Sequence, residues 1–390
     1  MSKMISLSLF IFIFIFILIS PTLSSPPPTP SQPSIGITYT SRGTHLPHQS
    51  LLIPILQSLK ITSVRLPQAD PDIIRSFSFS GISLLLSIPN TLIPELASNQ
   101  SKALRWLNHH VTPFYPRVHI TTISVGNNDV LDSSTPPSNH SHFLLPAINN
   151  VNRALHELGI DKISVSTTFS FANVITTAFP PSSAKFQESV AESLMKPLLD
   201  FLAESKSPFL INLYPYNLYR MDSEIPIGYA VFEQGPFNFR DDLLSGVRYR
   251  NLFDMMVDSV ITSMALLGHE DVPLVVTETG WPSFDESKEV DANPVYAEMY
   301  VKGLVKHLRS GLGTPLKRDG IVGTYIFELF DEDPKEVSDS KLLMQWGIMY
   351  TNTTLKFHIN FSSAVRRGEF TGLWSMLIVC WVVLMVLMVQ

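Results

Sequence analysis

The chain alternates short runs of β-forming residues with longer stretches whose apolar residues recur every three or four positions. This alternation is typical of a parallel sheet whose outside is covered by helices. Eight strands are expected, at Ile35–Tyr39, Ser63–Leu66, Ser83–Pro89, Ile120–Asn127, Lys162–Phe169, Phe209–Tyr216, Pro273–Gly280 and Gly323–Glu332. Amphipathic helices are expected between them, for example at Leu144–Leu158, Val190–Ser205, Asn251–Leu267 and Tyr296–Ser310.

Eight is the number of strands that closes a parallel barrel, and a domain of this length suits an α/β fold of the (β/α)8 TIM-barrel type with insertions. A Pro-rich leader occupies residues 26–34, and no later linker divides the chain. A single barrel domain is therefore expected over residues 35–361. An open doubly wound sheet is the alternative, but no glycine-rich phosphate-binding turn follows the first expected strand.

The N-terminal residues 1–25 have the layout of a secretory signal peptide. Lys3 precedes an apolar run from Ile5 to Ile19, and small residues follow up to Ser25. A membrane anchor is the alternative, but the apolar run is shorter than the about 20 residues that span a bilayer. Secretion agrees with the N-x-S/T glycosylation triplets, which begin at Asn99, Asn139, Asn352 and Asn360.

The C-terminal residues 362–390 resemble the signal for a glycosylphosphatidylinositol (GPI) anchor. Three small residues, Ser362 to Ala364, precede a polar spacer at 365–372 and an apolar segment at 373–389. Attachment is expected near Ser362, with the tail removed, and a plain transmembrane tail is the alternative. The protein is thus expected on the outer face of the plasma membrane or in the cell wall, with the lipid as its only membrane contact.

Composition excludes several classes of function. The formal net charge is −6, so the surface offers no electrostatic reason to bind nucleic acid. The one cysteine, Cys380, lies in the C-terminal signal, so neither disulfides nor a thiol nucleophile are expected in the mature domain. The eleven histidines are scattered, and no metal or other cofactor is expected. We expect the domain to be monomeric.

The chemistry of a (β/α)8 barrel is found at the C-terminal ends of its strands. Glu278 ends the seventh expected strand, where a charge emerging from an apolar run is costly unless it has a task or a partner. The alternative to a catalytic role is a structural ion pair with a barrel arginine such as Arg65. The eighth run also ends in carboxylates. The alternative to a functional role for them is that they are solvated charges of a loop.

Several aromatic and polar residues near the strand ends are candidates for sugar binding. Tyr39, Tyr214 and Trp281 can stack against sugar rings, although core aromatics would look the same in the sequence. Hydrogen bonds to sugar hydroxyls are expected from Asn127, Glu332 and Lys335. The expected partner is therefore a polysaccharide.

Six segments carry a resemblance to plant endo-β-1,3-glucanases of glycoside hydrolase family seventeen. They are Ile123–Asn127, Ile211–Tyr216, Asn251–Asp258, Val276–Ser283, Thr324–Phe327 and Trp346–Gly347. The resemblance extends over residues 35–361 and implies a (β/α)8 barrel that cleaves β-1,3-glucan with retention of configuration. It also implies that Glu278 is the nucleophile, and that Glu332 and Lys335 match family residues after the eighth strand.

The position of the family's acid/base glutamate is altered in this chain. Asn128 stands there, and an amide cannot donate a proton as an acid. Asp129 follows directly and is a possible substitute acid. Strand alternation and the shorter side chain of aspartate argue against that substitution.

Two further departures lie near the cleft. Pro67 and Gln68 replace the tyrosine and aspartate that the family commonly has after the second strand, and Leu343 replaces a glutamate. The sequence thus leaves two hypotheses. The first is a glycoside hydrolase of the endo-β-1,3-glucanase type with a weakened or relocated acid. The second is a catalytically impaired surface protein that binds β-glucan.

Overall fold

The computed structural model describes residues 33–41, 45–128, 130–131, 141–287, 289–331 and 344–361. The expected signal peptide, most of the leader and the expected anchor signal lie outside these residues. So do six residues singled out above, namely Asp129, Asn139, Glu332, Lys335, Leu343 and Ser362. In the part of the chain that is described, no helix is both long enough and apolar enough to cross a bilayer.

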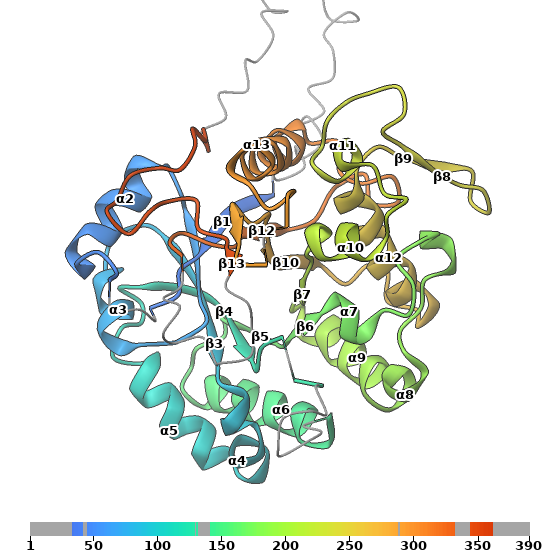
Figure 1. Ribbon diagram of the computed structural model, residues 1–390. Coiled ribbons are helices and arrows are strands. Elements are labelled where there is room, and N and C mark those ends of the chain that lie inside the picture. Colours follow the sequence, from blue (N-terminus) through green and yellow to red (C-terminus); the bar gives the residue numbers. More distant parts are fainter. Residues whose placement is uncertain are drawn as a thin grey trace, which may run out of the picture. The chain divides into compact units, whose positions relative to one another are not determined.

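Nine parallel strands form one sheet in the order β5-β4-β3-β2-β1-β12-β10-β7-β6, surrounded by helices (Figure 1). Their bounds are β1 (Ser34–Thr38), β2 (Ser63–Leu66), β3 (Ser83–Ile88), β4 (His119–Val125), β5 (Ser164–Ser166), β6 (Thr168–Ser170), β7 (Phe209–Asn212), β10 (Leu274–Thr279) and β12 (Gly323–Ile326). The predicted (β/α)8 barrel in a single domain is confirmed.

The fifth expected strand is divided in two at the buried Thr167. Its first part, β5, pairs with β4, and its second part, β6, pairs with β7. Since the two parts are consecutive in the chain, the barrel closes through this one strand. The Ser124 and Thr168 hydroxyls, 2.9 Å apart, connect β4 to β6 across the division.

Two strand ends were predicted wrongly. The sixth run was expected to reach Tyr216, but β7 ends at Asn212 because Pro215 begins a helix, where its fixed φ and missing N–H are tolerated. The eighth run was expected to reach Glu332, but β12 ends at Ile326. Beyond it the backbone N–H groups of Glu328 and Leu329 donate to Trp346 and Thr38, at 3.3 and 3.0 Å.

The helices pack on the outer face of the sheet. They are α2 (Leu52–Ser58), α3 (Pro71–Ser76), α4 (Ile93–Ser98), α5 (Gln100–His110), α6 (Ser141–Glu157), α7 (Phe171–Val174), α8 (Glu188–Val190), α9 (Lys196–Ser205), α10 (Pro215–Met221), α11 (Ile227–Ala230), α12 (Leu252–Leu266) and α13 (Pro294–Ser310). Two small antiparallel pairs add to the barrel, β8 (Arg240–Asp242) with β9 (Val247–Tyr249) and β11 (Phe284–Asp285) with β13 (Met344–Gln345).

Local sequence explains where the elements begin and which face they bury. The Asn293 side chain caps α13 by accepting from the N–H of Tyr296 at 3.0 Å, and Gly311, with φ of 69°, ends the helix. Along β3, Leu84 and Leu86 join the cluster under the helices, whereas Leu85 joins a separate small cluster. Successive side chains of a strand point to opposite faces of the sheet, so both faces of β3 are buried.

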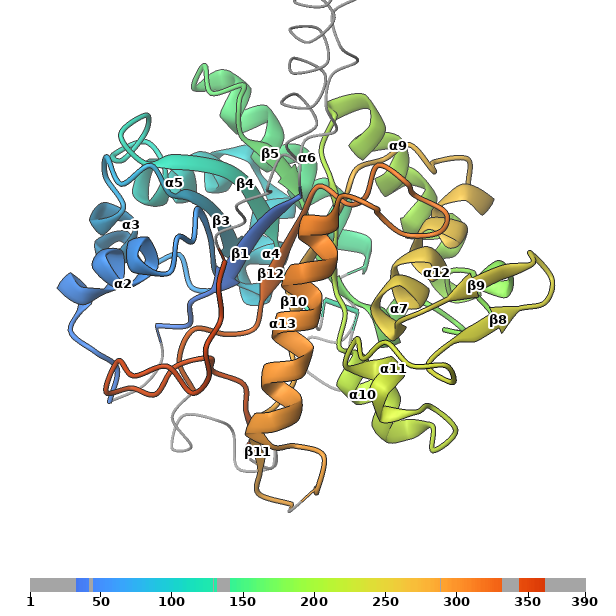
Figure 2. The same cartoon turned by 90° about the horizontal axis from the view of Figure 1, so that it is seen from above.

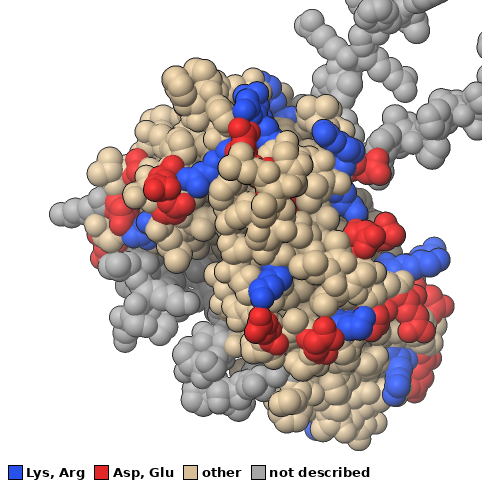
Figure 3. Space-filling view, turned by 90° about the vertical axis from the view of Figure 1, so that its right-hand side faces the viewer, with Lys and Arg blue, Asp and Glu red and all other residues tan. Residues whose placement is uncertain are grey.

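Charged residues are sparse on the outside of the domain, in keeping with a charged fraction of 16%. Figure 3 shows the face that carries β8 and β9, where acidic and basic side chains form small mixed groups on a largely uncharged surface. This face has no broad area of one charge.

A buried carboxylate, Asp258, ties α12 to the loop after α13. It accepts a hydrogen bond from the N–H of Leu316 at 3.0 Å and another from the hydroxyl of Thr314. Burial raises the pKa of Asp258 to about 7, although these hydrogen bonds favour the charged form.

We predict that Asp258→Asn flattens the pH dependence of stability. A carboxyl group whose pKa is higher in the folded state than in the unfolded chain binds its proton more tightly when folded. The free energy of unfolding should therefore fall as the pH rises from the unfolded pKa, about 4, toward 7. Urea unfolding at several pH values measures this, and parallel curves for wild type and variant would contradict the prediction.

Candidate active site

A cleft of about 860 Å³ opens at the C-terminal ends of the strands, where (β/α)8 enzymes have their active sites. It is lined by residues that follow most of the strands, with two more from α5. Those used below are Gln68, Asp70, Asn90, Trp106, His110, Asn127, Asn128, Tyr214 and Glu278. The structure thus brings together Asn127, Asn128, Tyr214 and Glu278, which are far apart in the sequence.

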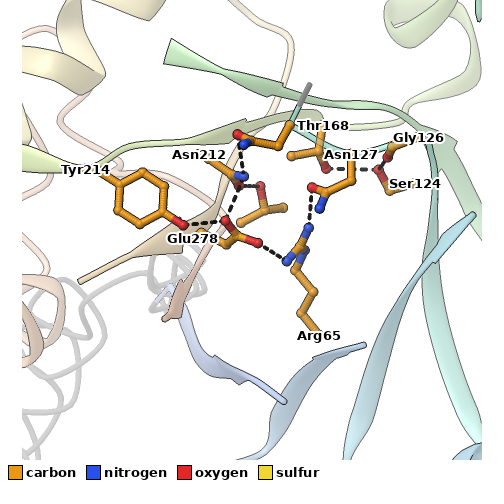
Figure 4. A network of polar contacts seen from close by, with 10 residues as sticks. Arg65, Ser124, Gly126, Asn127, Thr168, Asn212, Tyr214 and Glu278 are labelled. Atoms are coloured by element: carbon orange, nitrogen blue, oxygen red, sulfur yellow. Dashed lines mark hydrogen bonds and ion pairs between the residues drawn. The ribbon is translucent and has the colours of Figure 1, made fainter. Parts of the chain in front are cut away.

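Glu278 lies near the end of β10 and is only 6% exposed. Its Oε1 accepts from the guanidinium of Arg65, and its Oε2 accepts from Asn212 Nδ2 at 2.8 Å and from the Tyr214 hydroxyl (Figure 4). These donors offset the cost of burying a carboxylate. The ion pair with Arg65, which the sequence offered as an alternative to a catalytic role, is present, and the same carboxylate lines the cleft.

Arg65 is fully buried in β2 and contacts two elements of the site. One end of its guanidinium binds Glu278, and Nη2 donates to Asn127 Oδ1 at 2.6 Å. The rigid fork of the guanidinium therefore fixes the distance between β10 and the segment after β4. Burial, and then the charge of Glu278, raises the pKa of Tyr214, so the phenol stays protonated and donates to the carboxylate.

The segment after β4 is held in one conformation by its neighbours. Gly126 has φ of 85°, and a Cβ there would lie 2.8 Å from Val130 Cγ2, so only glycine fits. The side chain of Asn90 accepts from the N–H of Asn127 at 2.7 Å and donates to its carbonyl at 3.0 Å. Asn128, the next residue, has φ of 45°, which asparagine tolerates better than most residues.

Asn128 lies close to Glu278. Its Oδ1 accepts from Asn212 Nδ2 at 3.2 Å, and the same Nδ2 donates to Glu278. One side-chain amide therefore separates Asn128 from Glu278. Thr277 orients this amide by donating its hydroxyl to Asn212 Oδ1 at 2.7 Å.

The cleft presents the Glu278 carboxylate with the Asn128 amide beside it. Among the described lining residues, Asp70 is the other carboxylate, and its Oδ1 caps α3 by accepting from the N–H of Asp72 at 2.8 Å. Neither Asn128 nor Asn212 can act as a general acid. The described part of the site can therefore supply a carboxylate and hydrogen bonds. Asp129 is not among the described residues.

The aromatic residues that the sequence suggested for stacking have different positions. Tyr214 lines the cleft, with its ring 5.2 Å from that of Trp346. Trp281 is only 2% exposed, and its indole N–H donates to the carbonyl of Asp291 at 2.8 Å. Tyr39 is also buried, with its edge against Phe330. The structure therefore favours the alternative of core aromatics for Trp281 and Tyr39.

The sequence did not single out Trp106 and His110, which also line the cleft. Their rings are stacked with centroids 4.5 Å apart, and the two residues are one turn apart on α5. Because they come from a helix and not from a strand end, no strand-end signal marked them. From the sequence alone, an aromatic residue in an amphipathic helical pattern is assigned to the hydrophobic core. Its place in a cleft becomes visible only when the positions of the neighbouring loops are known.

Comparison with known proteins assigns the family. A family model described as glycosyl hydrolases family 17 matches residues 35–361. The chain belongs to this family. The matched range contains each described residue of the candidate site.

Relatives of this family 17 chain are found among curated proteins of Arabidopsis thaliana. It is 36% identical to glucan endo-1,3-beta-glucosidase 12, over 84% of this chain and 60% of that protein. It is 31% identical to glucan endo-1,3-beta-glucosidase 14, over 90% of this chain and 91% of that protein. The chain thus spans about 60% of the length of the first relative.

Solved structures of similar sequence have the same fold. CJP38, a β-1,3-glucanase and allergen of Cryptomeria japonica pollen, is 35% identical, with a TM-score of 0.76. The match covers 84% of this chain and 99% of that one, so nearly the whole solved chain corresponds to part of this one. One of two plant β-glucan endohydrolases with distinct substrate specificities is 30% identical, with a TM-score of 0.74.

We predict that Arg65→Met lowers the free energy of unfolding by about 3–5 kcal/mol, because it leaves the buried Glu278 carboxylate without its cation. Arg75→Met is the matched control, since Arg75 pairs with Asp72 on the exposed surface and should cost at most about 1 kcal/mol. Urea unfolding at pH 7 measures both. Equal losses in the two variants would show that the buried pair is not a major source of stability.

Proposed function

We propose that the cleft binds β-1,3-glucan and that the protein is a retaining hydrolase of this polymer with Glu278 as the nucleophile. The observation that carries the proposal is the Glu278 carboxylate, which lines the cleft and is oriented by Arg65, Asn212 and Tyr214. The relatives are named glucan endo-1,3-beta-glucosidases, which supports the choice of polymer.

In the proposed reaction, a carboxylate oxygen of Glu278 attacks the anomeric carbon while the bond to the departing sugar oxygen breaks. Water then displaces Glu278 from the resulting glycosyl-enzyme, which gives net retention. The donors on both carboxylate oxygens hold the nucleophile in one orientation toward the cleft, which lowers the entropic cost of attack.

Proton transfer is the impaired part of this reaction. The departing sugar oxygen needs a proton, and Asn128, beside Glu278, cannot provide one. Loss of general acid catalysis costs on the order of 10²–10⁴ in rate. This substitution favours a second candidate function, a β-glucan-binding surface protein with little turnover. Asp129 is the nearest sequence position from which a substitute acid could come.

We predict that an aryl β-glucoside with an acidic phenol reacts far better than laminarin, because its leaving group departs without a proton. Asn128→Glu should then raise laminarin hydrolysis, by up to about 10²–10⁴. Deletion of Asp129 in the same variant restores the spacing that the family has around its acid. Rates of phenol and reducing-sugar release measure these effects.

Two controls decide between the assignments. Glu278→Gln should abolish release from both substrates if Glu278 is the nucleophile. Wild-type hydrolysis of laminarin at ordinary endoglucanase rates, lost in Asp129→Ala, would instead assign the acid role to Asp129. If neither substrate reacts but glucan still binds, the second candidate function is the correct one.

We also propose that the protein is a secreted monomer, held at the outer face of the plasma membrane by a GPI anchor near Ser362. The signal-like residues 1–25 and 362–390 support this location. Glycosylation is proposed at Asn99, Asn352 and Asn360, which are exposed on the described domain, and at Asn139.

We predict that the Glu278→Gln protein binds laminarihexaose more tightly than cellohexaose, because a curved β-1,3-linked chain suits a cleft of this family. Asn127 and Tyr214 supply hydrogen-bonding groups in the cleft, and a handful of such bonds suffices for micromolar to millimolar affinity. Calorimetric titration measures both ligands, with a melting curve as the control for folding. Equal or tighter binding of cellohexaose would contradict the substrate assignment.

A further inference from the structure

The cleft extends from Glu278 to two helices on the outside of the sheet. Glu278 lies on β10, whereas Asp70 directly precedes α3, and Trp106 and His110 belong to α5. These two helices lie next to each other on the blue-to-teal side of the barrel (Figure 2). The cleft volume of about 860 Å³ is in the upper part of the range of about 300–1,000 Å³ that ligand sites have. It therefore has room for more than one sugar ring.

The imidazole of His110 is held in place by two contacts with Trp106. The two rings are stacked at an interplanar angle of 17°, with centroids 4.5 Å apart. The Nδ1 atom of His110 lies 2.9 Å from the carbonyl oxygen of Trp106, one turn earlier in α5. Because a carbonyl oxygen can only accept, Nδ1 carries a proton and donates it to this bond. In the neutral ring, the other nitrogen, Nε2, is then an acceptor.

The Nε2 atom is available to a ligand. No residue in the described part of the chain forms a hydrogen bond with it, and the half-buried His110 lines the cleft. Burial lowers the pKa of His110, so the ring is neutral near pH 7. The wall of the cleft thus presents an acceptor with a fixed orientation, which suits a hydroxyl donor.

Gln68 and Asp70 add a donor and a second acceptor to this end of the cleft. The Oε1 atom of Gln68 accepts from the N–H of Ser41 at 3.3 Å, which leaves the side-chain NH₂ group as a donor. Asp70 uses Oδ1 to accept from the N–H of Asp72 at 2.8 Å, which leaves Oδ2 as an acceptor. Sugar hydroxyls both donate and accept, so this mixed set suits a neutral sugar, whereas the carboxylate of Asp70 repels an anion.

We propose that His110, Gln68 and Asp70 bind a further glucosyl unit of a glucan chain that also occupies the cleft at Glu278. One hydroxyl of this unit donates to His110 Nε2, and others bond to the Gln68 amide and the Asp70 carboxylate. Since Trp106 already holds the imidazole, the bond costs little side-chain entropy. The inference rests on the proposed glucan binding, and it applies to both candidate functions because it involves no proton transfer.

Two substitutions of His110 test this subsite in the Glu278→Gln protein, which cannot hydrolyse the ligand if Glu278 is the nucleophile. Glutamine can place an amide where Nε2 lies, whereas asparagine reaches only the position of Nδ1. His110→Asn should therefore weaken the binding of laminarihexaose about 2–10-fold, the effect of one hydrogen bond, and His110→Gln should retain most of the affinity. Calorimetric titration measures both, with melting curves as the control for folding.

The matched control is His156→Asn, which removes an exposed histidine from the last turn of α6, as His110→Asn removes one from the last turn of α5. His156 pairs with Asp161 and does not line the cleft, so this variant should bind laminarihexaose as tightly as the Glu278→Gln parent.

A ¹⁵N spectrum of the histidine-labelled parent gives a readout that needs no substitution of His110. Laminarihexaose should shift the Nε2 resonance of His110, identified by its loss in His110→Gln, and should leave that of His156 in place. Unchanged affinity in His110→Asn, or an unmoved His110 resonance, overturns the subsite while glucan binding by the parent still stands. A parent that does not bind laminarihexaose would overturn the glucan assignment and the subsite with it.

Discussion

The buried ion pair between Arg65 and Glu278 is the interaction on which the site depends. A guanidinium with no exposure to water, inside the wall of a barrel, requires a carboxylate partner, and removal of either charge leaves the other uncompensated. Through its second nitrogen, Arg65 also holds Asn127, so one side chain of β2 connects Glu278 of β10 with the segment after β4. The position of the Glu278 carboxylate and the connection between these strands therefore have a common origin.

The sequence predicted the barrel because strands buried on both faces leave a continuous apolar signal. It did not predict the division at Thr167, since a break in pairing inside an apolar run changes neither composition nor periodicity. It placed two strand ends too late because the residues after them, Leu213–Tyr216 and Phe327–Glu332, still look like β-forming or apolar segments. Those ends depend on tertiary contacts and on Pro215, which the runs themselves do not reveal.

For the site, the sequence indicated the buried charged residues more reliably than the aromatic ones. Glu278 stands out because ionised groups are rare in apolar strands, and its partner Arg65 stands out for the same reason. Trp281 follows a strand directly, yet its indole reaches the backbone of Asp291 and lies in the core. The polar atom of a tyrosine or tryptophan can form its hydrogen bond inside the protein or at the surface. Its neighbours in space therefore decide whether the ring faces a ligand.

The division at Thr167 also separates the residues of the candidate site into two sets. Strands β1 to β5 carry Arg65, Asn127 and Asn128, whereas β6 to β12 carry Asn212, Tyr214 and Glu278. The barrel is thus two half-barrels that meet along a ladder between β1 and β12 and along a seam where the hydrogen-bond ladder is interrupted. Arg65, which belongs to the first half and pairs with Glu278 of the second, links the two half-barrels inside the cleft.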